Sequence, residues 1–281
     1  MLLQTSSGPT ARPVRVPYRS AMTSAGEAPH ATAQGADEVD SQTAIERGRP
    51  SYSWRYGQDR RLEMVRRFVD LDGARVLDVG CGIGTYVRRF RQFSDDVHGV
   101  EVEPERVAEA SAELPNIVEG RGESLPYPDA HFDLVFSNEV IEHVDDDRRT
   151  AAEMVRVTRP GGSIVIFAPN RLYPFETHGA YLRGRYVFGN IPLINWLPGP
   201  LRDRFAPHVR AYTGRGLRAL FSGQPVELVH HRAIYPGFDN LSARRPRLGG
   251  MLRRLLYVAE TTPLHALGLS HFLVLRKPNP R

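Results

Sequence analysis

The stretch VLDVGCGIGTYVRRF, residues 76–90, places a cluster of glycines between an apolar segment and a basic, amphipathic one. The glycines are Gly80, Gly82 and Gly84, and Asp78 precedes them within the apolar run. Glycine has no Cβ, so it accepts positive φ angles and lets a ligand lie directly against the backbone. Between a strand and the N-terminus of a helix, such a loop predicts a small-molecule site in a doubly wound α/β fold.

Strand-like and helix-like segments alternate along most of the chain, which predicts a parallel sheet with crossover helices. The expected strands up to residue 170 are 74–80, 96–103, 116–120, 134–137 and 163–170. The alternation then stops over the aromatic, Pro- and Gly-rich stretch 171–212 and resumes after it. A connection this long inside a compact domain is more often functional than idle, so we expect an inserted segment that covers the substrate.

Composition limits the organisation and the classes of partner. Residues 1–48 are rich in Ser, Thr, Ala, Pro and Gly, and we expect a disordered tail there, with the domain at 49–281. The net charge is +5, but the basic residues are scattered and not interleaved with aromatics, so no nucleic-acid partner is expected. The single cysteine, Cys81, excludes an internal disulfide and fits a reducing, cytoplasmic location.

Membrane insertion is not expected, because no apolar stretch approaches the length that spans a bilayer. Peripheral contact with a membrane stays open, since FGNIPLINWLPGPL, inside the 171–212 segment, is apolar and aromatic. The oligomeric state cannot be read from the sequence.

The spacing of the glycines discriminates between two cofactor classes. Dinucleotide enzymes favour G-x-G-x-x-G, whereas this chain has glycines at alternate positions, and the carboxylate of Asp78 would oppose a pyrophosphate. A carboxylate there suits an ammonium group instead. Glu101 ends the second expected strand, where an acid can accept both ribose hydroxyls of a nucleoside. These features favour S-adenosylmethionine; a nicotinamide-dependent oxidoreductase and a non-catalytic cofactor-binding protein are the alternatives.

The segments DVGCGIG and VHGVE together resemble class I S-adenosylmethionine-dependent methyltransferases. GRGESLPYPDAHFDLVFSNEVIEHV and the later RPGG resemble the type 11 branch of that superfamily, so the resemblance spans about residues 58–170. It implies a Rossmann-like, seven-stranded sheet that is mostly parallel with an antiparallel last strand, and helices on both faces. It also implies S-adenosylmethionine as the cofactor.

The resemblance and the loop chemistry together give the expected cofactor contacts. Arg121 stands where the branch usually has an adenine-contacting Asp, so the backbone of Gly122 or the side chain of Glu123 is expected to serve there. The full expected set is Asp78, Gly80, Cys81, Gly82, Gly84, Glu101, Val102, Gly122, Glu123, Asn138 and Glu139.

The catalytic candidates follow the fourth expected strand. His143 is placed to act as a general base, with Glu139 beside it. EVIEHV resembles the same segment of ubiquinone-type O-methyltransferases, which implies Glu139, Glu142 and His143 as ligands of a divalent metal. We favour an interpretation without metal, in which Glu142 and His143 cap the next helix or pack beneath the cofactor.

The inserted segment offers aromatic and polar side chains that suit a planar or lipid-like acceptor, although they could equally form the core of a packed subdomain. We predict methyl transfer to a small-molecule or lipid-like acceptor, at an oxygen atom. The loop 235–240 is expected to face the same cavity. The expected acceptor contacts are His178, Tyr181, Trp196, His208 and Arg210.

Overall fold

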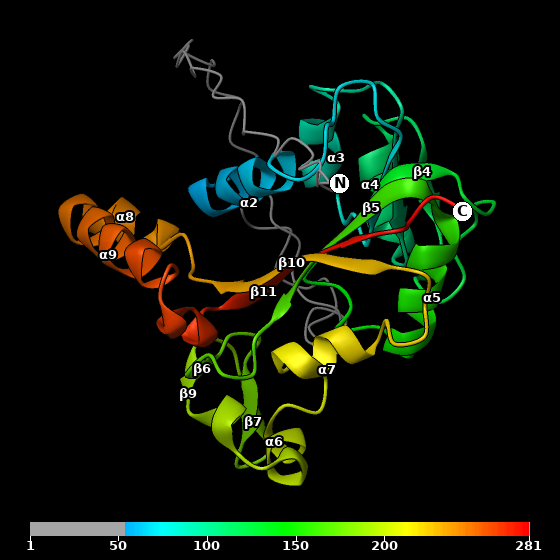
Figure 1. Ribbon diagram of the computed structural model, residues 1–281. Helices are drawn as coiled ribbons and strands as arrows, with labels where there is room; N and C mark the ends of the chain where they lie inside the picture. The colour runs from blue at the N-terminus through cyan, green and yellow to red at the C-terminus, as the bar shows by residue number, and fades with distance from the viewer. Residues whose placement is uncertain (1–53, 281) are drawn as a thin grey trace, which may run out of the picture. The chain divides into compact units, whose positions relative to one another are not determined.

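The computed structural model describes residues 54–280, so the expected tail at 1–48 lies outside the described residues. Seven strands form one sheet in the order β10-β11-β5-β4-β1-β2-β3 (Figure 1). β11 pairs antiparallel with β5 and β10, whereas the other neighbours in this sheet pair parallel. The expected mostly parallel, Rossmann-like sheet is confirmed. Its strands are β1 (Val76–Val79), β2 (Val97–Glu101), β3 (Ile117–Glu119), β4 (Phe132–Asn138), β5 (Thr158–Pro169), β10 (Glu227–Ile234) and β11 (Ser270–Arg276).

Helices cover both faces of the sheet, and successive strand residues supply two separate hydrophobic clusters. In β4, Leu134 and Phe136 join one cluster, while Val135 joins the other. The first cluster includes buried residues of α2 (Tyr56–Arg66), α3 (Thr85–Phe90) and α4 (Pro104–Ser111). The second includes residues of α5 (Asp147–Val157) and α7 (Gly214–Ala219). Because both faces are buried, the strands read as continuous apolar runs in the sequence.

The start of α5 and the strand that follows it differ from the sequence-based expectation. Asp146 is the N-cap of α5, and its side chain accepts a hydrogen bond from the backbone N–H of Arg149 at 2.9 Å. Glu142 and His143 therefore do not cap this helix. The RPGG motif, residues 159–162, lies inside β5 rather than between a helix and a strand, because β5 begins directly after α5.

The inserted segment, residues 171–212, folds into small elements around a buried ion pair. Its strands form two antiparallel pairs, β6 with β9 and β7 with β8. Arg202 Nη2 lies 2.8 Å from Glu176 Oε2, and both side chains are buried. Arg202 Nη1 also donates to the carbonyl of Val209 at 2.8 Å. The elements are β6 (Phe175–Glu176), β7 (Ala180–Leu182), β8 (Arg185–Val187), β9 (Ile191–Pro192), η1 (Ile194–Trp196) and α6 (Gly199–Phe205).

Between β10 and β11 the chain forms α8 (Asp239–Arg244), α9 (Pro246–Ala259) and η2 (Pro263–Leu267). α8 and α9 lie together at the left of Figure 1, beyond one end of the sheet. In residues 54–280, no helix has the length and apolarity that crossing a bilayer requires.

Candidate cofactor site

The glycine-rich loop after β1 has a backbone that other residues would not readily adopt. Gly80, Gly82 and Gly84 have φ angles of 74°, 55° and 80°, all in the left-handed region. A Cβ added to Gly80 would also lie 2.5 Å from Cγ2 of Val140. The N–H groups of Gly80 and Cys81 both donate to the carbonyl of Val100, at 2.8 and 3.0 Å, which fastens the loop to β2. The loop therefore presents bare backbone at the carboxyl edge of the sheet.

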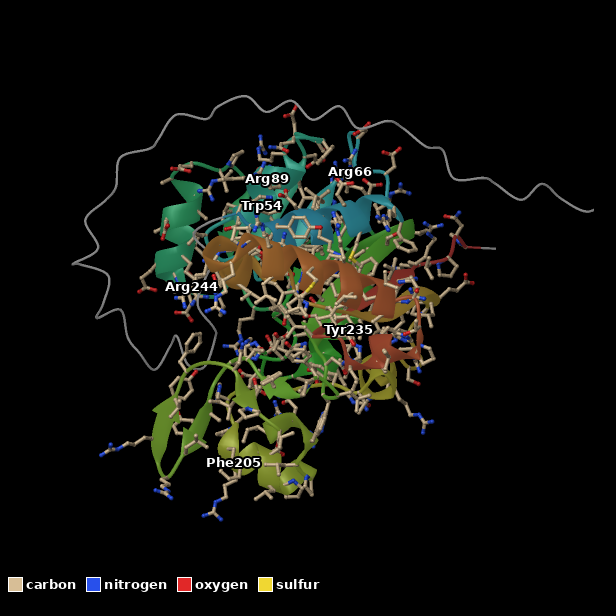
Figure 2. All side chains as sticks on the ribbon, turned by 90° about the vertical axis from the view of Figure 1, so that its left-hand side faces the viewer. Trp54, Arg66, Arg89, Phe205, Tyr235 and Arg244 are labelled. Carbon is tan, nitrogen blue, oxygen red and sulfur yellow. The ribbon has the colours of Figure 1, made fainter. Side chains whose placement is uncertain are left out.

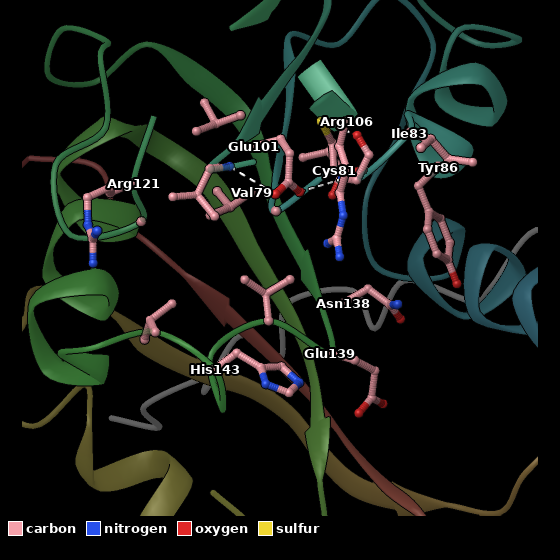
Figure 3. A pocket seen from close by; sticks show the side chains of 18 of the residues that line it. Val79, Cys81, Ile83, Tyr86, Glu101, Arg106, Arg121, Asn138, Glu139 and His143 are labelled. Atoms are coloured by element: carbon pink, nitrogen blue, oxygen red, sulfur yellow. Dashed lines mark hydrogen bonds between the residues drawn. The ribbon is translucent and has the colours of Figure 1, made fainter. Parts of the chain in front are cut away.

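Glu101, the last residue of β2, is held by backbone donors on both sides. Its Oε2 accepts a hydrogen bond from the N–H of Gly82 at 2.8 Å. Its Oε1 accepts from the N–H groups of Val102 and Glu103, at 2.9 and 3.1 Å (Figure 3). The side-chain rotamer is thus fixed before any ligand arrives, and the carboxylate lies on the cavity wall.

Asp78 lies on the same wall, in β1, and its carboxyl group is buried. Burial, and next the negative charge of Glu101, raise its pKa well above the usual value. When a cation binds beside such a buried carboxyl group, the ionised form of the group becomes more favourable. The pair therefore fits a ligand that carries both an ammonium group and hydroxyl groups.

A cavity of about 410 Å³ opens beside the loop, at the carboxyl ends of β1, β2 and β4. Ligands bind at this edge in doubly wound sheets. Figure 3 shows Arg121 at one end of the cavity, Tyr86 at the other and Glu101 between them. Gly84 is not in the lining; it is the N-cap of α3. The expected cofactor residues that line the cavity are Asp78, Gly80, Cys81, Gly82, Glu101, Val102, Gly122, Glu123, Asn138 and Glu139.

At the Arg121 end, the charged side chains are engaged with the loop before α5. Arg121 forms an ion pair with Asp145. Glu123 Oε1 accepts hydrogen bonds from the N–H groups of Asp145 and Asp146, at 2.8 and 3.2 Å. Gly122 lies between them in the lining, and a Cβ added there would lie 2.9 Å from Cγ2 of Thr150. Both expected adenine contacts, the backbone of Gly122 and the side chain of Glu123, thus lie at this end of the cavity.

Arg61, from α2, is a site residue that the sequence analysis missed. Its guanidinium donates to Oδ1 of Asn138, to Oε1 of Glu139 at 2.8 Å and to Oγ of Ser270 at 2.8 Å. Burial raises the pKa of Glu139, but the Arg61 charge, the Ser270 hydrogen bond and His178 outweigh it, and the net pKa is lowered. The Glu139 carboxylate, the second catalytic candidate, is therefore held by Arg61 and Ser270.

Tyr86 was also missed. Its side chain is buried in the lining, and its hydroxyl has no hydrogen-bond partner among residues 54–280. A buried unpaired hydroxyl is uncommon and suits a polar ligand atom. No pattern in the sequence indicates its role, because Tyr86 looks like one more apolar position of α3.

Glu142, His143 and His178 form a compact cluster at the other side of the cavity. Their ligand atoms lie within 4.8 Å of one another. The Glu142 carboxylate is fully buried, and within the described range neither oxygen has a hydrogen-bond partner. Burial, and then the charge of Glu139, raise its pKa well above the usual value. The set that could hold a metal thus contains His178 in place of Glu139, which is bound to Arg61 instead.

Of the expected acceptor contacts, the structure brings only His178 to the lining of either described cavity. Trp196 is exposed and donates to the carbonyl of Leu172 at 3.0 Å. Arg210 donates to the carbonyls of Val144 and Asp145 and so fastens the loop before α5. Tyr181 and His208 pack edge to face against each other inside the insertion. The acceptor role of these four side chains stays a prediction, because neither described cavity includes them.

The loop expected at 235–240 lines a second cavity of about 460 Å³. Tyr235, Phe238 and Leu241 contribute apolar surface to it, and Gln58 and Thr177 line both cavities. The two cavities are thus neighbours that share wall residues.

Comparison with known proteins agrees with this geometry. The methyltransferase domain family matches residues 77–166. Norajmaline N-methyltransferase of Rauvolfia serpentina is 39% identical over 102 residues, which are 33% of this chain and 35% of the relative. Malonyl-[acyl-carrier protein] O-methyltransferase of Pectobacterium atrosepticum is 36% identical over 98 residues, 34% of this chain and 38% of the relative. The chain thus spans less than half the length of these curated relatives.

The fold is shared with solved structures. The S-adenosylmethionine-dependent methyltransferase of Mesorhizobium loti superposes with a TM-score of 0.55 at 20% identity, over 76% of this chain and 96% of that one. Sheet order, glycine loop and strand-end acid define a Rossmann-like domain of the methyltransferase type. The family match falls within this fold: residues 77–166, which resemble a methyltransferase domain, contain most of β1, the glycine loop and Glu101. A probable S-adenosylmethionine-dependent methyltransferase of Mycolicibacterium smegmatis is also similar, at 36% identity over 102 residues, which are 36% of this chain and 40% of the relative. This similarity favours S-adenosylmethionine over a nicotinamide cofactor.

Proposed function

We propose that this chain transfers the methyl group of S-adenosylmethionine to an oxygen atom of a small, lipid-like acceptor. The observation that carries the proposal is the continuity of one cavity, whose lining runs from the glycine loop and Glu101 to His143 and His178. A cofactor held at one end would have a histidine available at the other. The named relatives include both an N- and an O-methyltransferase, so the choice of oxygen rests on that histidine.

The residues of the loop edge fit the cofactor group by group. Glu101 has two carboxylate oxygens for the ribose hydroxyls, and Asp78 is a buried acid suited to the ammonium group. Tyr86 has a buried hydroxyl without a described partner, which suits the carboxylate. S-Adenosylmethionine supplies an electrophilic methyl group. The remaining work of the protein is to align the acceptor and to exclude water.

His143 is the residue that we assign to proton transfer. Its side chain is 8% exposed and lines the cavity on the acceptor side. A histidine in that position can take the proton from an acceptor hydroxyl as the oxygen attacks. Glu139 is a positioning residue here, because Arg61 and Ser270 occupy its carboxylate.

The second cavity is the proposed entrance for the acceptor. Its wall combines apolar side chains, Ile234, Tyr235 and Leu269 among them, with polar and charged ones that include Arg60 and Arg61. Apolar surface with placed polar groups is typical of small-molecule pockets. This composition supports an acceptor that has an apolar part and a polar group.

A second proposal, that a divalent cation assists the reaction, is favoured by the cluster of Glu142, His143 and His178. His178 Nδ1 lies 3.1 Å from Glu176 Oε1, and His178 Nε2 lies 3.8 Å from Glu142 Oε1. A carboxylate on one ring nitrogen orients the other nitrogen toward a metal. A cation would also neutralise the buried Glu142 carboxylate and could bind the acceptor oxygen.

The cofactor is tested by calorimetric titration of the full chain with S-adenosylhomocysteine. We expect wild-type binding in the micromolar range and a loss of about 100-fold in Glu101→Ala, since hydrogen bonds to a charged group each contribute about 1.5–3 kcal/mol. Glu105→Ala, a neighbouring exposed acid, is the matched control. Equal binding by wild type and Glu101→Ala would refute the assignment of the site.

Acceptor chemistry is tested separately. His143→Ala should lower kcat for radiolabelled methyl transfer to hydroxylated acceptors while the affinity for S-adenosylhomocysteine stays unchanged. Unchanged kcat would exclude His143 as the base.

The cation proposal is tested by metal analysis and thermal shift with Zn²⁺, Mn²⁺ and Mg²⁺ after treatment with a chelator. His178→Gln should abolish any metal-dependent stabilisation, and His265→Gln, a histidine outside both cavities, should retain it. If the wild type shows no uptake, the cluster is not a metal site.

A further inference from the structure

Helix α9 carries an apolar stripe on its outward face. Leu248, Met251, Leu255 and Val258 are all exposed, with Leu255 and Val258 at 62% and 66%. Their spacing of three, four and three residues places them on one side of the helix. η2, which contacts α9, adds the exposed Leu264. The surfaces of soluble proteins carry scattered apolar residues, but an aligned row of this kind marks an interaction surface.

The inward face of α9 carries Leu252 and Leu256 together with side chains that form polar contacts to α2. Arg60 of α2 stacks on the ring of Tyr257, 3.8 Å from its centroid. Arg253 likewise stacks on Tyr56 at 4.0 Å. Glu260, just after α9, forms an ion pair with Arg60. These contacts hold α9 to α2, and the row of Leu248, Met251, Leu255 and Val258 is left exposed.

Exposed arginines surround the apolar stripe. Arg244 and Arg245 precede α9, and Arg247 and Arg254 lie on it; all four are exposed. None of them forms an ion pair with any residue in the range 54–280. The sequence from 240 to 259 contains no acidic residue. Figure 2 looks onto this side of the molecule, with Arg244 near one end of the orange helix α9.

The charge pattern discriminates between occupants of this surface. A second copy of the chain docked through the same stripe would bring the arginine clusters of both copies together, which is unfavourable. An anionic lipid surface complements the arginines and takes up the apolar side chains at the same time.

We propose that α8 and α9 form a docking surface for membranes that contain anionic phospholipids. α9 lies parallel to the membrane plane, with the row from Leu248 to Val258 in the interface and the four arginines at the phosphate groups. Asp239, Asn240 and Leu241 of α8 line the second cavity, so docking brings that cavity next to the lipid. Docking itself does not depend on the proposed methyl transfer; only this route for a lipid-like acceptor does.

The test is co-sedimentation of the full chain with two kinds of vesicle, phosphatidylcholine alone and an equal mixture with phosphatidylglycerol. We expect binding to the mixed vesicles that weakens with added salt. Arg247→Gln and Arg254→Gln should each reduce the partition coefficient about fivefold. Leu255→Ser should reduce it roughly tenfold. Leu228→Ser, which removes an exposed leucine of β10 instead, is the matched control and should bind as wild type.

No binding to mixed vesicles, or binding that Leu255→Ser leaves intact, would overturn the proposal. Equal binding to both kinds of vesicle would overturn the role of the arginines. Self-association that Leu255→Ser abolishes, measured by light scattering without vesicles, would assign the stripe to a second copy instead. Circular dichroism and S-adenosylhomocysteine binding verify that each variant is folded, so failure of docking is separable from failure of the cofactor site.

Discussion

Two buried carboxyl groups, one at the cofactor edge and one in the inserted segment, have opposite shifts in pKa. Asp78 has a raised pKa, because it is buried and faces Glu101. Glu176 is also buried, which raises its pKa, but hydrogen bonds from His178 and the charge of Arg202 lower it to about 2. The insertion carries its own counter-charge, whereas the cofactor edge lacks one at Asp78. The insertion is therefore complete without a ligand, whereas the cofactor edge would be completed by a cationic one.

This difference separates stability from function in the two regions. Loss of a charge partner in the insertion should unfold local structure, since it leaves an uncompensated buried charge. Loss of the acid at the cofactor edge should increase the stability of the protein and lower its affinity for the ligand. Two substitutions test this difference in charge, and a third tests the packing of the glycine loop. The largest effect is expected in the insertion.

Arg202→Met should reduce the free energy of unfolding by about 3–5 kcal/mol, because the buried Glu176 would lose its guanidinium partner and keep only His178. Thermal unfolding and limited proteolysis measure the effect, and cleavage should begin within 171–212. Arg204→Met, on the exposed side of the same helix, is the control and should change stability by less than about 0.5 kcal/mol. An Arg202→Met protein as stable as wild type would mean that the insertion is not held by this pair.

Gly80→Ala should lower the free energy of unfolding by about 2–4 kcal/mol. This is the cost of a left-handed φ for alanine added to the cost of its close contact with Val140. Gly73→Ala is a matched comparison: its φ is 67°, but nothing lies within 4 Å of the added Cβ, so only the backbone cost of about 1–2 kcal/mol applies. Urea unfolding gives both values. If the two variants lose equal stability, contact with Val140 does not constrain the loop.

Asp78→Asn should increase the stability of the protein at neutral pH but lower its affinity for S-adenosylhomocysteine by about tenfold. The folded pKa of Asp78 is raised above its unfolded value, so its contribution to stability is lost as pH rises through the folded pKa. Over the same interval the carboxylate forms, and affinity for a ligand with an ammonium group should increase. Calorimetry across pH measures this increase, and the Asn variant should lack it. A pH-independent difference in affinity would show that Asp78 does not face the ammonium group.

Most of the sheet could be predicted from the sequence, because buried parallel strands and glycine loops leave local patterns. The strands of the insertion could not be predicted, since elements of two or three residues have no periodicity to detect. The strand expected at 163–170 begins earlier, at Thr158, and Gly161 has a φ of 77° inside it. The loop expected at 235–240 overlaps the first two residues of α8.

The candidate site divides in the same way. Its loop residues follow one another in sequence, so the glycine pattern indicated them. Arg61 reaches Ser270, 209 positions away, and His178 meets Glu142 from a different segment. Such contacts depend on tertiary packing, and no spacing in a single sequence encodes them.

The strand order has a consequence for how the domain is assembled. β10 hydrogen-bonds in the sheet only to β11, and β11 lies between β10 and β5. During synthesis β10 leaves the ribosome first, but it has no neighbour in the sheet until residues 270–276 follow. Ser270, which bonds Arg61 and Glu139, belongs to the same late strand. The sheet edge and the anchor of the cofactor site should therefore form together, as a late step after the earlier strands have paired.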